Sequence, residues 1–277
     1  MILVETLVKT LAIVTLAVAT YVSHSLSFSG ILASIFLGVI VLFLGGWDCF
    51  IIMLAFLILG VASTKYRRKD KESDASTQEK GGVRSWVNVL ANGGPAAISI
   101  MLEHVFRMEV FLVFFITTVC SAAADTLATE LGLLSRSKPR LITNLKKSVE
   151  KGVSGGVTLL GTFAGLSGAM AIALVSLTLR QANAPGILPR VGDAQRLLAA
   201  CSTGGFLGMI VDSLLGATIQ EVYVSKADGR LHEKPGKQGE YVLIKGFRGF
   251  NNHMVNFFSN IIAGILGIMI YVFTVAL

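Results

Sequence analysis

Charged residues are scarce in this sequence, and their scarcity excludes a water-soluble fold. Only 15% of the 277 residues are Asp, Glu, Lys or Arg, whereas 53% are hydrophobic. Ordinary soluble domains carry about 25% charged residues. Cysteine and histidine are few as well, with three Cys and four His at no spacing typical of metal ligands. We therefore expect neither a disulfide framework nor a zinc site.

The sequence is instead rich in long apolar segments. A helix needs ~20 apolar residues to cross the ~30 Å hydrocarbon core of a bilayer. Such runs cover residues 10–47, 49–64, 157–179, 197–211 and 254–277. The first run is too long for one helix, and polar residues from His24 onward divide it near residue 26. Ala17 and Ala19 form an A-x-A pattern, but the basic region before them is thin, so we predict a membrane span rather than a cleaved leader.

Residues 93–125 also form two predicted crossings. Glu103, His104, Arg107 and Glu109 would otherwise sit at the centre of one long helix, where charges are costly. The chain then has eight predicted helices. Because residues 93–104 are few for a crossing, seven helices with a re-entrant piece remain an alternative.

The basic residues gather in three loops. Of 24 Lys and Arg residues, 19 fall in residues 64–92, 131–156 and 220–253. The positive-inside rule places all three loops in the cytoplasm and, with eight helices, both termini outside. The predicted fold is an all-α, polytopic transmembrane bundle of about seven or eight helices. Its parts are N-terminal transmembrane helices (1–63), a basic cytoplasmic loop (64–92) and a transmembrane core that would be catalytic (93–277).

Two of these loops have distinct compositions. Residues 68–82 mix both charges with Ser, Thr and Gly and lack apolar periodicity, which predicts a flexible linker. In the third loop, EVYV and EYVLIK flank an Asp-Gly turn signal and predict a small β-hairpin.

Three carboxylates lie in or beside apolar helices. Asp125 and Glu130 stand at a predicted cytoplasmic helix end, and an ionisable group at membrane depth is a candidate for function. Five residues rotate a helix by ~140°, so these two side chains do not share a face. Asp212 lies inside a helix with Gly208 and Gly216 on its own face. The structural alternatives are a helix-end carboxylate and a small-xxx-small helix contact.

The carboxylates have hydroxyl neighbours, in Asp125-Thr126 and Asp212-Ser213. Oxygen donors of this kind suit Mg²⁺, which takes one or two carboxylates together with waters and phosphate oxygens. The hypothesis is that Asp125 and Asp212 hold Mg²⁺, and that Glu130 completes the metal shell or orients nearby cations.

A basic, Gly-rich loop, SRSKPRLITNLKKSVEKGVSGGVT, lies between these helices. It offers Lys138 and Arg140 as cations and Gly155 and Gly156 as bare backbone amides before a helix N-terminus, a combination that suits phosphate. It is no Walker A sequence, and its basic residues also satisfy the positive-inside rule. Asn92, Asn252 and Asn256 stand at polar boundaries where they could contact a nucleotide, with helix capping as the alternative.

Several segments occur in an order that resembles a known family. They are ANGG, ADTLATELGLLSRSKPRLITNLKK, GVSGGVTLLGT, GGFLGMIVDSLLGA and NNHMVNFFS. From about residue 84 to the end, the chain is similar to the integral-membrane phytyl-phosphate kinase family, the family of transmembrane protein 19. It is distantly similar to dolichol kinases and phosphatidate cytidylyltransferases.

The resemblance implies transfer of a phosphoryl group from a nucleoside triphosphate, CTP or UTP, to an isoprenyl monophosphate such as phytyl or geranylgeranyl phosphate. The family pattern falls on Asp125, Thr126, Glu130, Lys138, Arg140, Gly155, Gly156, Asp212 and Asn256. One departure is the stretch before the glycine pair, where Lys151-Gly152-Val153-Ser154 replaces the expected Pro-Gly-Thr.

The expected site has two groups of residues. The catalytic and metal-binding residues are Asp125, Glu130 and Asp212. The nucleotide- and phosphate-binding residues are Asn92, Thr126, Lys138, Arg140, Gly155, Gly156, Ser213, Asn252 and Asn256. A CTP-dependent cytidylyltransferase and a transporter remain alternatives, and a homodimer stays open. We expect no nucleic-acid partner, because the basic residues lack interleaved aromatics.

Overall fold

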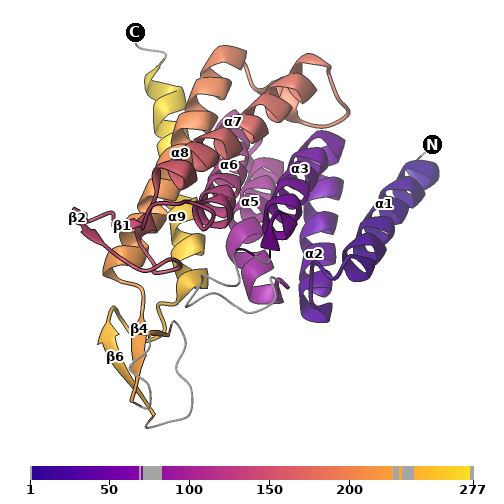
Figure 1. The fold of residues 1–277 in the computed structure, drawn as a ribbon. Coiled ribbons are helices and arrows are strands. Elements are labelled where there is room, and N and C mark those ends of the chain that lie inside the picture. The colour runs from indigo at the N-terminus through magenta and orange to yellow at the C-terminus, as the bar shows by residue number, and fades with distance from the viewer. Residues whose placement is uncertain (1, 69, 71–82, 227–230, 233–239, 275–277) are drawn as a thin grey trace.

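The structure is a computed structural model that describes residues 2–68, 70, 83–226, 231–232 and 240–274 (Figure 1). Within these residues the chain is a bundle of long helices with two small sheets at one end. The helices are α1 (Ile2–Val22), α2 (Phe28–Ile40), a π-helical turn (Val41–Gly45), α3 (Gly46–Lys65), α5 (Trp86–Phe106), α6 (Glu109–Gly132), α7 (Leu159–Gln181), α8 (Ala194–Thr218) and α9 (Asn252–Phe273). A 3₁₀ turn (Leu188–Arg190) lies between α7 and α8.

Seven helical segments of the described chain are long and apolar enough to cross a membrane, and the longest of them is divided into α2 and α3. This segment, Phe28–Lys65, turns at Gly46, whose φ of 88° is in the region that favours glycine. At the far end of α3, the Lys65 Nζ donates to the Ser23 carbonyl at 3.1 Å, beside the start of α2. Helices α2 and α3 therefore form a hairpin, and the predicted bundle of about seven or eight helices and the division near residue 26 are confirmed.

Helix α5 starts at Trp86, so the predicted start at residue 93 was wrong. The Gly-Gly-Pro sequence suggested a helix N-terminus, but Pro95 lies inside the helix. A proline there leaves the carbonyl four residues earlier without its helical donor. That carbonyl, of Ala91, accepts from the Asn260 side chain of α9 at 3.5 Å. A neighbouring helix thus compensates for the proline, and α5 is a full crossing rather than a re-entrant piece.

Helix α6 forms the centre of the bundle and packs on α3, α5, α7, α8 and α9. Glycines on the neighbouring helices allow this close packing. A Cβ at Gly168 of α7 would lie 2.9 Å from the Ala123 carbonyl, and one at Gly205 of α8 would collide with Cys120. Small residues at such contacts let membrane helices approach closely. Helix α1 differs, since Ile13 and Thr20 are its only buried residues within the described chain.

Both sheets lie at the same end of the bundle (Figure 1). The first sheet has the order β2-β1-β3, with β1 (Arg140–Leu141), β2 (Asn144–Ser148) and β3 (Gly156–Val157), and was not predicted. The second has the order β5-β4-β6, with β4 (Val222–Ser225), β5 (Leu231–His232) and β6 (Tyr241–Lys245). Antiparallel pairing of β4 with β6 confirms the predicted hairpin. Its Asp-Gly turn and most of the predicted linker 68–82 lie outside the described residues.

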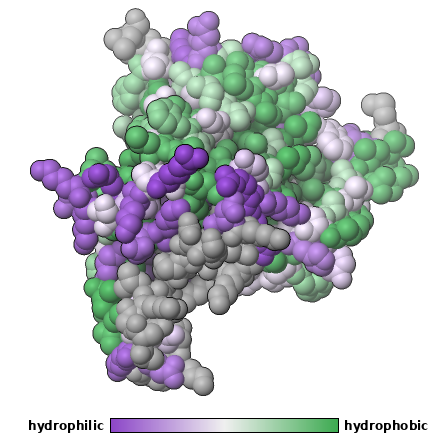
Figure 2. Space-filling model, viewed as in Figure 1, coloured by the Kyte–Doolittle hydropathy of each residue, from purple (hydrophilic) through white to green (hydrophobic). Residues whose placement is uncertain are grey.

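We call the end that carries residues 66–68, 83–85, 133–158, 219–226 and 240–251 the basic face, and the other end the opposite face. Helix α1 begins and α9 ends on the opposite face, as the predicted topology requires (Figure 1). Figure 2 shows hydrophobic surface over the helices and hydrophilic side chains gathered where the helices meet the sheets. The protein is a multi-pass integral membrane protein. The assignment of the basic face to the cytoplasm stays a prediction.

Candidate functional site

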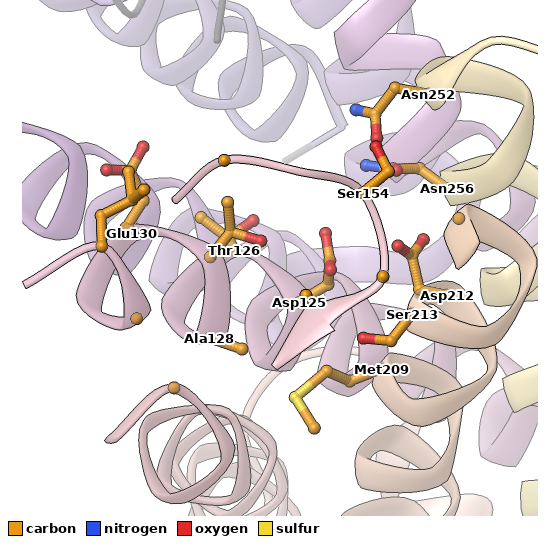
Figure 3. A pocket seen from close by; sticks show the side chains of 18 of the residues that line it. Asp125, Thr126, Ala128, Glu130, Ser154, Met209, Asp212, Ser213, Asn252 and Asn256 are labelled. Carbon is orange, nitrogen blue, oxygen red and sulfur yellow. The ribbon is translucent and has the colours of Figure 1, made fainter. Parts of the chain in front are cut away.

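A polar cavity of about 290 Å³ opens at the basic face. The ends of α3, α5, α6, α8 and α9 line it, together with the start of α7 and the loop before it (Figure 3). Its lining includes ten of the twelve predicted site residues: Asn92, Asp125, Thr126, Glu130, Gly155, Gly156, Asp212, Ser213, Asn252 and Asn256. Residues predicted from five separate segments of the sequence therefore share one cavity.

Asp125 and Asp212 form the centre of this polar cavity. Asp125 lies on α6 and Asp212 on α8, and their side chains are within hydrogen-bonding reach of each other. Figure 3 shows both carboxyl groups directed into the same space, below Ser154 and Asn256. Opposed carboxylates at such close range repel each other, so a cation between them or a shared proton is needed to keep them together.

Asp212 accepts a hydrogen bond from a neighbouring helix and lies close to the loop before α7. The Ser259 hydroxyl of α9 donates to Asp212 Oδ2 at 2.8 Å. A Cβ at Gly208 would collide with Ser121 of α6, which identifies Gly208 as a helix-packing residue, as the structural alternative proposed. One turn beyond Asp212, Gly216 lies against Ser154 of the loop. Gly208 therefore allows close helix packing one turn before Asp212, and Gly216 allows the loop to approach one turn after it.

Glu130 lines the cavity but points away from the two aspartates, as its angular offset from Asp125 predicts. The Thr64 hydroxyl of α3 donates to Glu130 Oε1 at 2.8 Å. The charge of Glu130 also acts on Arg84, where burial lowers the pKa of the guanidinium and Glu130 opposes that shift. Arginine stays protonated in proteins in spite of such shifts. This arrangement fits the second of the two roles predicted for Glu130, the orientation of a cation, which stays a prediction.

The loop before α7 is pressed onto α8 through Gly155. Its φ is +81°, and a Cβ there would collide with Ala217. The Gln220 side chain donates to the Ser154 hydroxyl at 2.8 Å and ties the loop to the end of α8. The amide of Gly156 already donates to the Val153 carbonyl at 2.9 Å, so it is not the bare amide that the sequence suggested.

Lys138 and Arg140 lie outside the lining of the cavity. Lys138 pairs with Glu150 at 3.7 Å, and both side chains are more than 70% exposed. Arg140 donates to the Leu145 carbonyl at 2.7 Å within its own sheet. The cations that do line the cavity are Arg84 and Lys151.

Asparagines supply amide groups on the α5 and α9 side of the cavity. Asn256 Nδ2 donates to Asn92 Oδ1 at 3.4 Å, which leaves the buried Asn256 Oδ1 without a hydrogen-bond partner in the part of the chain that the structure describes. Buried acceptors rarely stay unpaired, so this atom is available to a ligand. Asn251 caps α9 by accepting from the amides of His253 and Met254, so the capping alternative holds there.

Sequence reasoning missed Arg84 as a site residue. It lies after a stretch predicted as a flexible linker, and seven basic residues in residues 64–92 gave no reason to choose it. Its place depends on pairing with the turn between α1 and α2, where Ser27 N donates to the Arg84 carbonyl at 3.0 Å and Arg84 N donates to the Ser25 carbonyl at 3.2 Å. No local sequence signal encodes such a contact.

The donor set fits Mg²⁺ rather than a metal that needs a closed protein shell. In the described residues there is no group of three or more His, Cys, Asp and Glu side chains that could hold a metal ion. Two facing carboxylates and the amide oxygen of Asn256 are oxygen donors, and Mg²⁺ takes such donors together with waters and phosphate oxygens. Asp125 and Asp212 are the residues that would hold it, without Glu130.

The fold and cavity define a class of protein, a multi-pass membrane bundle with a polar, carboxylate-containing site at one membrane boundary. Comparison of sequences gives the family: residues 11–264 match the family described as integral membrane protein DUF92, to which this chain belongs. The family resemblance of the sequence motifs is thereby confirmed.

Three similar proteins come from an archaeon and a plant. "Uncharacterized membrane protein MJ0933" of Methanocaldococcus jannaschii is 33% identical over 273 residues, covering 97% of this chain and 95% of that protein. "Protein PGR" of Arabidopsis thaliana is 30% identical over 266 residues, with 91% of each chain covered. "Protein VTE6, chloroplastic" of the same plant is 24% identical over 254 residues, covering 90% of this chain and 66% of that protein. No solved structure matches the chain.

Proposed function

We propose that this protein is a membrane-embedded kinase that transfers the terminal phosphoryl group of a nucleoside triphosphate, CTP or UTP, to an isoprenyl monophosphate. The observation that carries the proposal is the facing pair Asp125 and Asp212 in a polar cavity at the membrane boundary. The family membership and the relatedness to VTE6 support a role at a membrane lipid.

In the proposed reaction, the protein itself takes little part in the covalent chemistry. An oxygen of the prenyl phosphate attacks the γ-phosphorus, the bond from that phosphorus to the β,γ-bridging oxygen breaks, and a nucleoside diphosphate leaves. Such transfers depend on positioning and charge neutralisation. Because the attacking phosphate oxygen is already ionised, no strong general base is needed.

In this proposal, different residues of the cavity bind the metal ion, the phosphates and the polar groups of the nucleotide. Asp125 and Asp212 hold the divalent cation, which neutralises charge on the nucleotide phosphates when it is bound. Lys151, from the loop before α7, and Arg84, from the segment before α5, supply cations to the cavity, the role first expected of Lys138 and Arg140. The Asn256 amide oxygen is an acceptor for a base, a ribose hydroxyl or a metal-bound water.

The test is product analysis with purified protein in detergent. Mg²⁺, each of the four common nucleoside triphosphates, and phytyl or geranylgeranyl monophosphate are incubated with the protein, and lipid and nucleotide products are identified by mass. We expect prenyl diphosphate and a nucleoside diphosphate, and neither product with Asp212→Asn. The matched control is Asp193→Asn at the N-cap of the same helix, because Asn caps a helix as well as Asp.

Two other outcomes would redirect the assignment. A nucleotide-linked lipid with release of diphosphate would make the protein a cytidylyltransferase, since attack at the α-phosphorus uses the same metal and cations. No turnover by folded protein would favour the transporter alternative. The position of the cavity at one end of the helices argues against transport, because transport sites usually lie near the midplane.

A further inference from the structure

A second cavity, of about 90 Å³, lies among the helices on the α2 side of the polar cavity. We call it the apolar groove. It is bounded by α2, α3 and α5, with α1 contributing one residue, Leu16. Most of its lining is aliphatic or aromatic: Leu16, Leu26, Leu37, Val41, Phe50, Met53, Leu54, Phe56, Leu57 and Val89.

The apolar groove and the polar cavity meet. Arg84, Asn88 and Asn92 line both of them. Asn88 and Asn92 lie one turn apart on α5, and Arg84 precedes the first turn of that helix. These three residues therefore lie where a polar space and an apolar space adjoin.

The apolar groove runs along the membrane normal. Arg84 lies at the basic face, while Phe50 and Val41 lie near the hairpin turn at the opposite face. Its lining from Ser34 to Val41 on α2 spans about 10 Å at ~1.5 Å per residue. The space is therefore polar at the membrane boundary and apolar within the hydrocarbon, the order of an amphiphile with its head at the boundary.

Arg84 is held rigidly at the junction. Backbone hydrogen bonds to Ser25 and Ser27 fix its main chain. Its guanidinium packs on Gly60 of α3, where a Cβ would lie 2.7 Å from the nearer nitrogen. A guanidinium pairs well with phosphate, through two parallel hydrogen bonds. Arg84 thus places a cation where the apolar groove begins.

The apolar groove has a side that a lipid can enter. Helix α1 packs mainly on α2 and has few buried residues, so it covers the apolar groove only loosely. The α2 residue Gly38 lines the apolar groove, and a Cβ there would make ordinary contacts of 3.7 Å with Phe50 of α3 and 3.8 Å with Ile13 of α1. The side on which α1 lies is therefore the side from which an apolar chain would have to reach the apolar groove.

We propose that the apolar groove binds the single hydrocarbon chain of a prenyl monophosphate, with its phosphate at Arg84 facing Asp125 and Asp212. The proposal rests on the proposed function, because it names the place of the lipid acceptor. A narrow groove with one cation at its mouth fits one chain with one phosphate. A diacyl lipid with a second chain does not fit this space.

Equilibrium binding of labelled geranylgeranyl monophosphate to the full-length protein in nanodiscs tests the inference without turnover. Gly38→Leu fills the apolar groove and is expected to weaken binding at least tenfold, and Gly38→Ala to weaken it by a smaller factor. Val39→Leu adds bulk at the adjacent lipid-exposed position and should leave binding within twofold. Dimethylallyl monophosphate, whose tail is short, should bind all these variants equally. Arg84→Gln should weaken binding of both phosphates.

Unchanged geranylgeranyl monophosphate binding by Gly38→Leu, or equal competition by phosphatidate, would overturn the inference. The two proposals fail in different ways. Normal turnover by wild type with unaffected binding by Gly38→Leu contradicts only the apolar groove assignment. Binding that Gly38→Leu abolishes, without product from any nucleotide, supports the groove and contradicts the kinase. No prenyl phosphate binding by wild type overturns both.

Discussion

The two ends of the same helices treat buried carboxylates differently. At the opposite face, acidic side chains accept from backbone amides or pair with an arginine. At the basic face, acidic side chains meet each other in an open cavity. Asp and Glu side chains therefore stabilise the fold at one end of the helices and remain available to a ligand at the other.

The opposite face shows three such structural carboxylates. Asp48 is fully buried and accepts from the amides of Leu188 at 2.7 Å and Cys49 at 2.6 Å, which fastens the α7–α8 connection to the α2–α3 turn. Glu103 pairs with Arg190 at 2.8 Å. Glu109 accepts from the Gly192 amide at 2.8 Å. Each of these groups holds a connection to the bundle.

At the basic face, the pair Asp125 and Asp212 opens onto a cavity instead. Asp212 has the Ser259 hydroxyl as a support, but the two aspartates face one another across a cavity, and the nearby Asn256 Oδ1 is unpaired among the described residues. Buried polar groups left in this state are costly unless a ligand satisfies them. The meeting of two carboxylates in an open cavity, rather than acidity alone, separates the candidate site from a structural carboxylate.

The largest expected effect is on turnover. Asp212→Asn and Asp125→Asn each remove one charge from the pair and should lower the proposed phosphoryl transfer about 100-fold or more, the scale of losing one preorganised electrostatic contact. Thermal unfolding in detergent should change little. Comparable activity in the variants, measured by prenyl diphosphate formation beside Asp193→Asn, would place the chemistry elsewhere.

The next effect falls on stability at the opposite face. Asp48→Ala leaves the amides of Leu188 and Cys49 without this acceptor and should cost about 2–6 kcal/mol, from ~1–3 kcal/mol for each orphaned buried donor. The midpoint of thermal unfolding reports this loss. If Asp48→Ala keeps the wild-type midpoint but loses turnover, the division between the two faces is wrong.

A third prediction concerns the cations. Lys151→Gln should raise the KM for the nucleotide roughly tenfold or more, because hydrogen bonds to charged groups contribute ~1.5–3 kcal/mol. Lys138→Gln, in the same loop but paired with exposed Glu150, should stay within about twofold. The reverse result would show that the family pattern locates the phosphate clamp better than the cavity does.

A smaller effect is expected from the loop that closes the cavity. Gly155→Ala adds a collision with Ala217 to the cost of a left-handed backbone, ~1–2 kcal/mol for a residue with a Cβ. The shifted loop should raise the nucleotide KM several-fold. Gly249→Ala is the matched control, because its φ is +89° and nothing lies within 4 Å of its Cβ position. Equal effects of both variants on KM would exclude a role for the loop position.

The smallest effect is expected at Thr64. Thr64→Val removes the hydroxyl that holds Glu130 and should cost about 0.5–1.5 kcal/mol of stability with a slight rise in the KM for the lipid. Thr10→Val on α1, whose hydroxyl bonds only within its exposed helix, is the comparison. A large loss of turnover in Thr64→Val alone would give Glu130 a more direct part in the chemistry.

The crossings were predictable because apolar length and basic loops are local properties of the sequence. The division near residue 26 and the hairpin of β4 with β6 followed from such signals. The start of α5 was not predictable, because a proline inside a helix needs Asn260 from another helix as a partner. The sheet of β1, β2 and β3 was also missed, since its strands are short and mostly polar.

The candidate site divides in the same way. Asp125 and Asp212 were predictable as ionisable residues in apolar helices, and their meeting required only that α6 and α8 pack together. The cations were harder to assign, because many Lys and Arg residues share one loop composition. Which of them faces the cavity depends on the folding of the β1–β2 sheet and on the pairing of Arg84 with Ser25 and Ser27. No local sequence pattern indicates either of these two arrangements.

The central claim is that Asp125 and Asp212 together hold a divalent cation with the nucleotide, and Mn²⁺ binding measured by electron paramagnetic resonance tests it most directly. With CTP or UTP present, wild-type protein and Asp193→Asn are expected to immobilise one Mn²⁺ per chain, and Asp125→Asn and Asp212→Asn to lose that signal. Equal Mn²⁺ binding by all four proteins would contradict the claim.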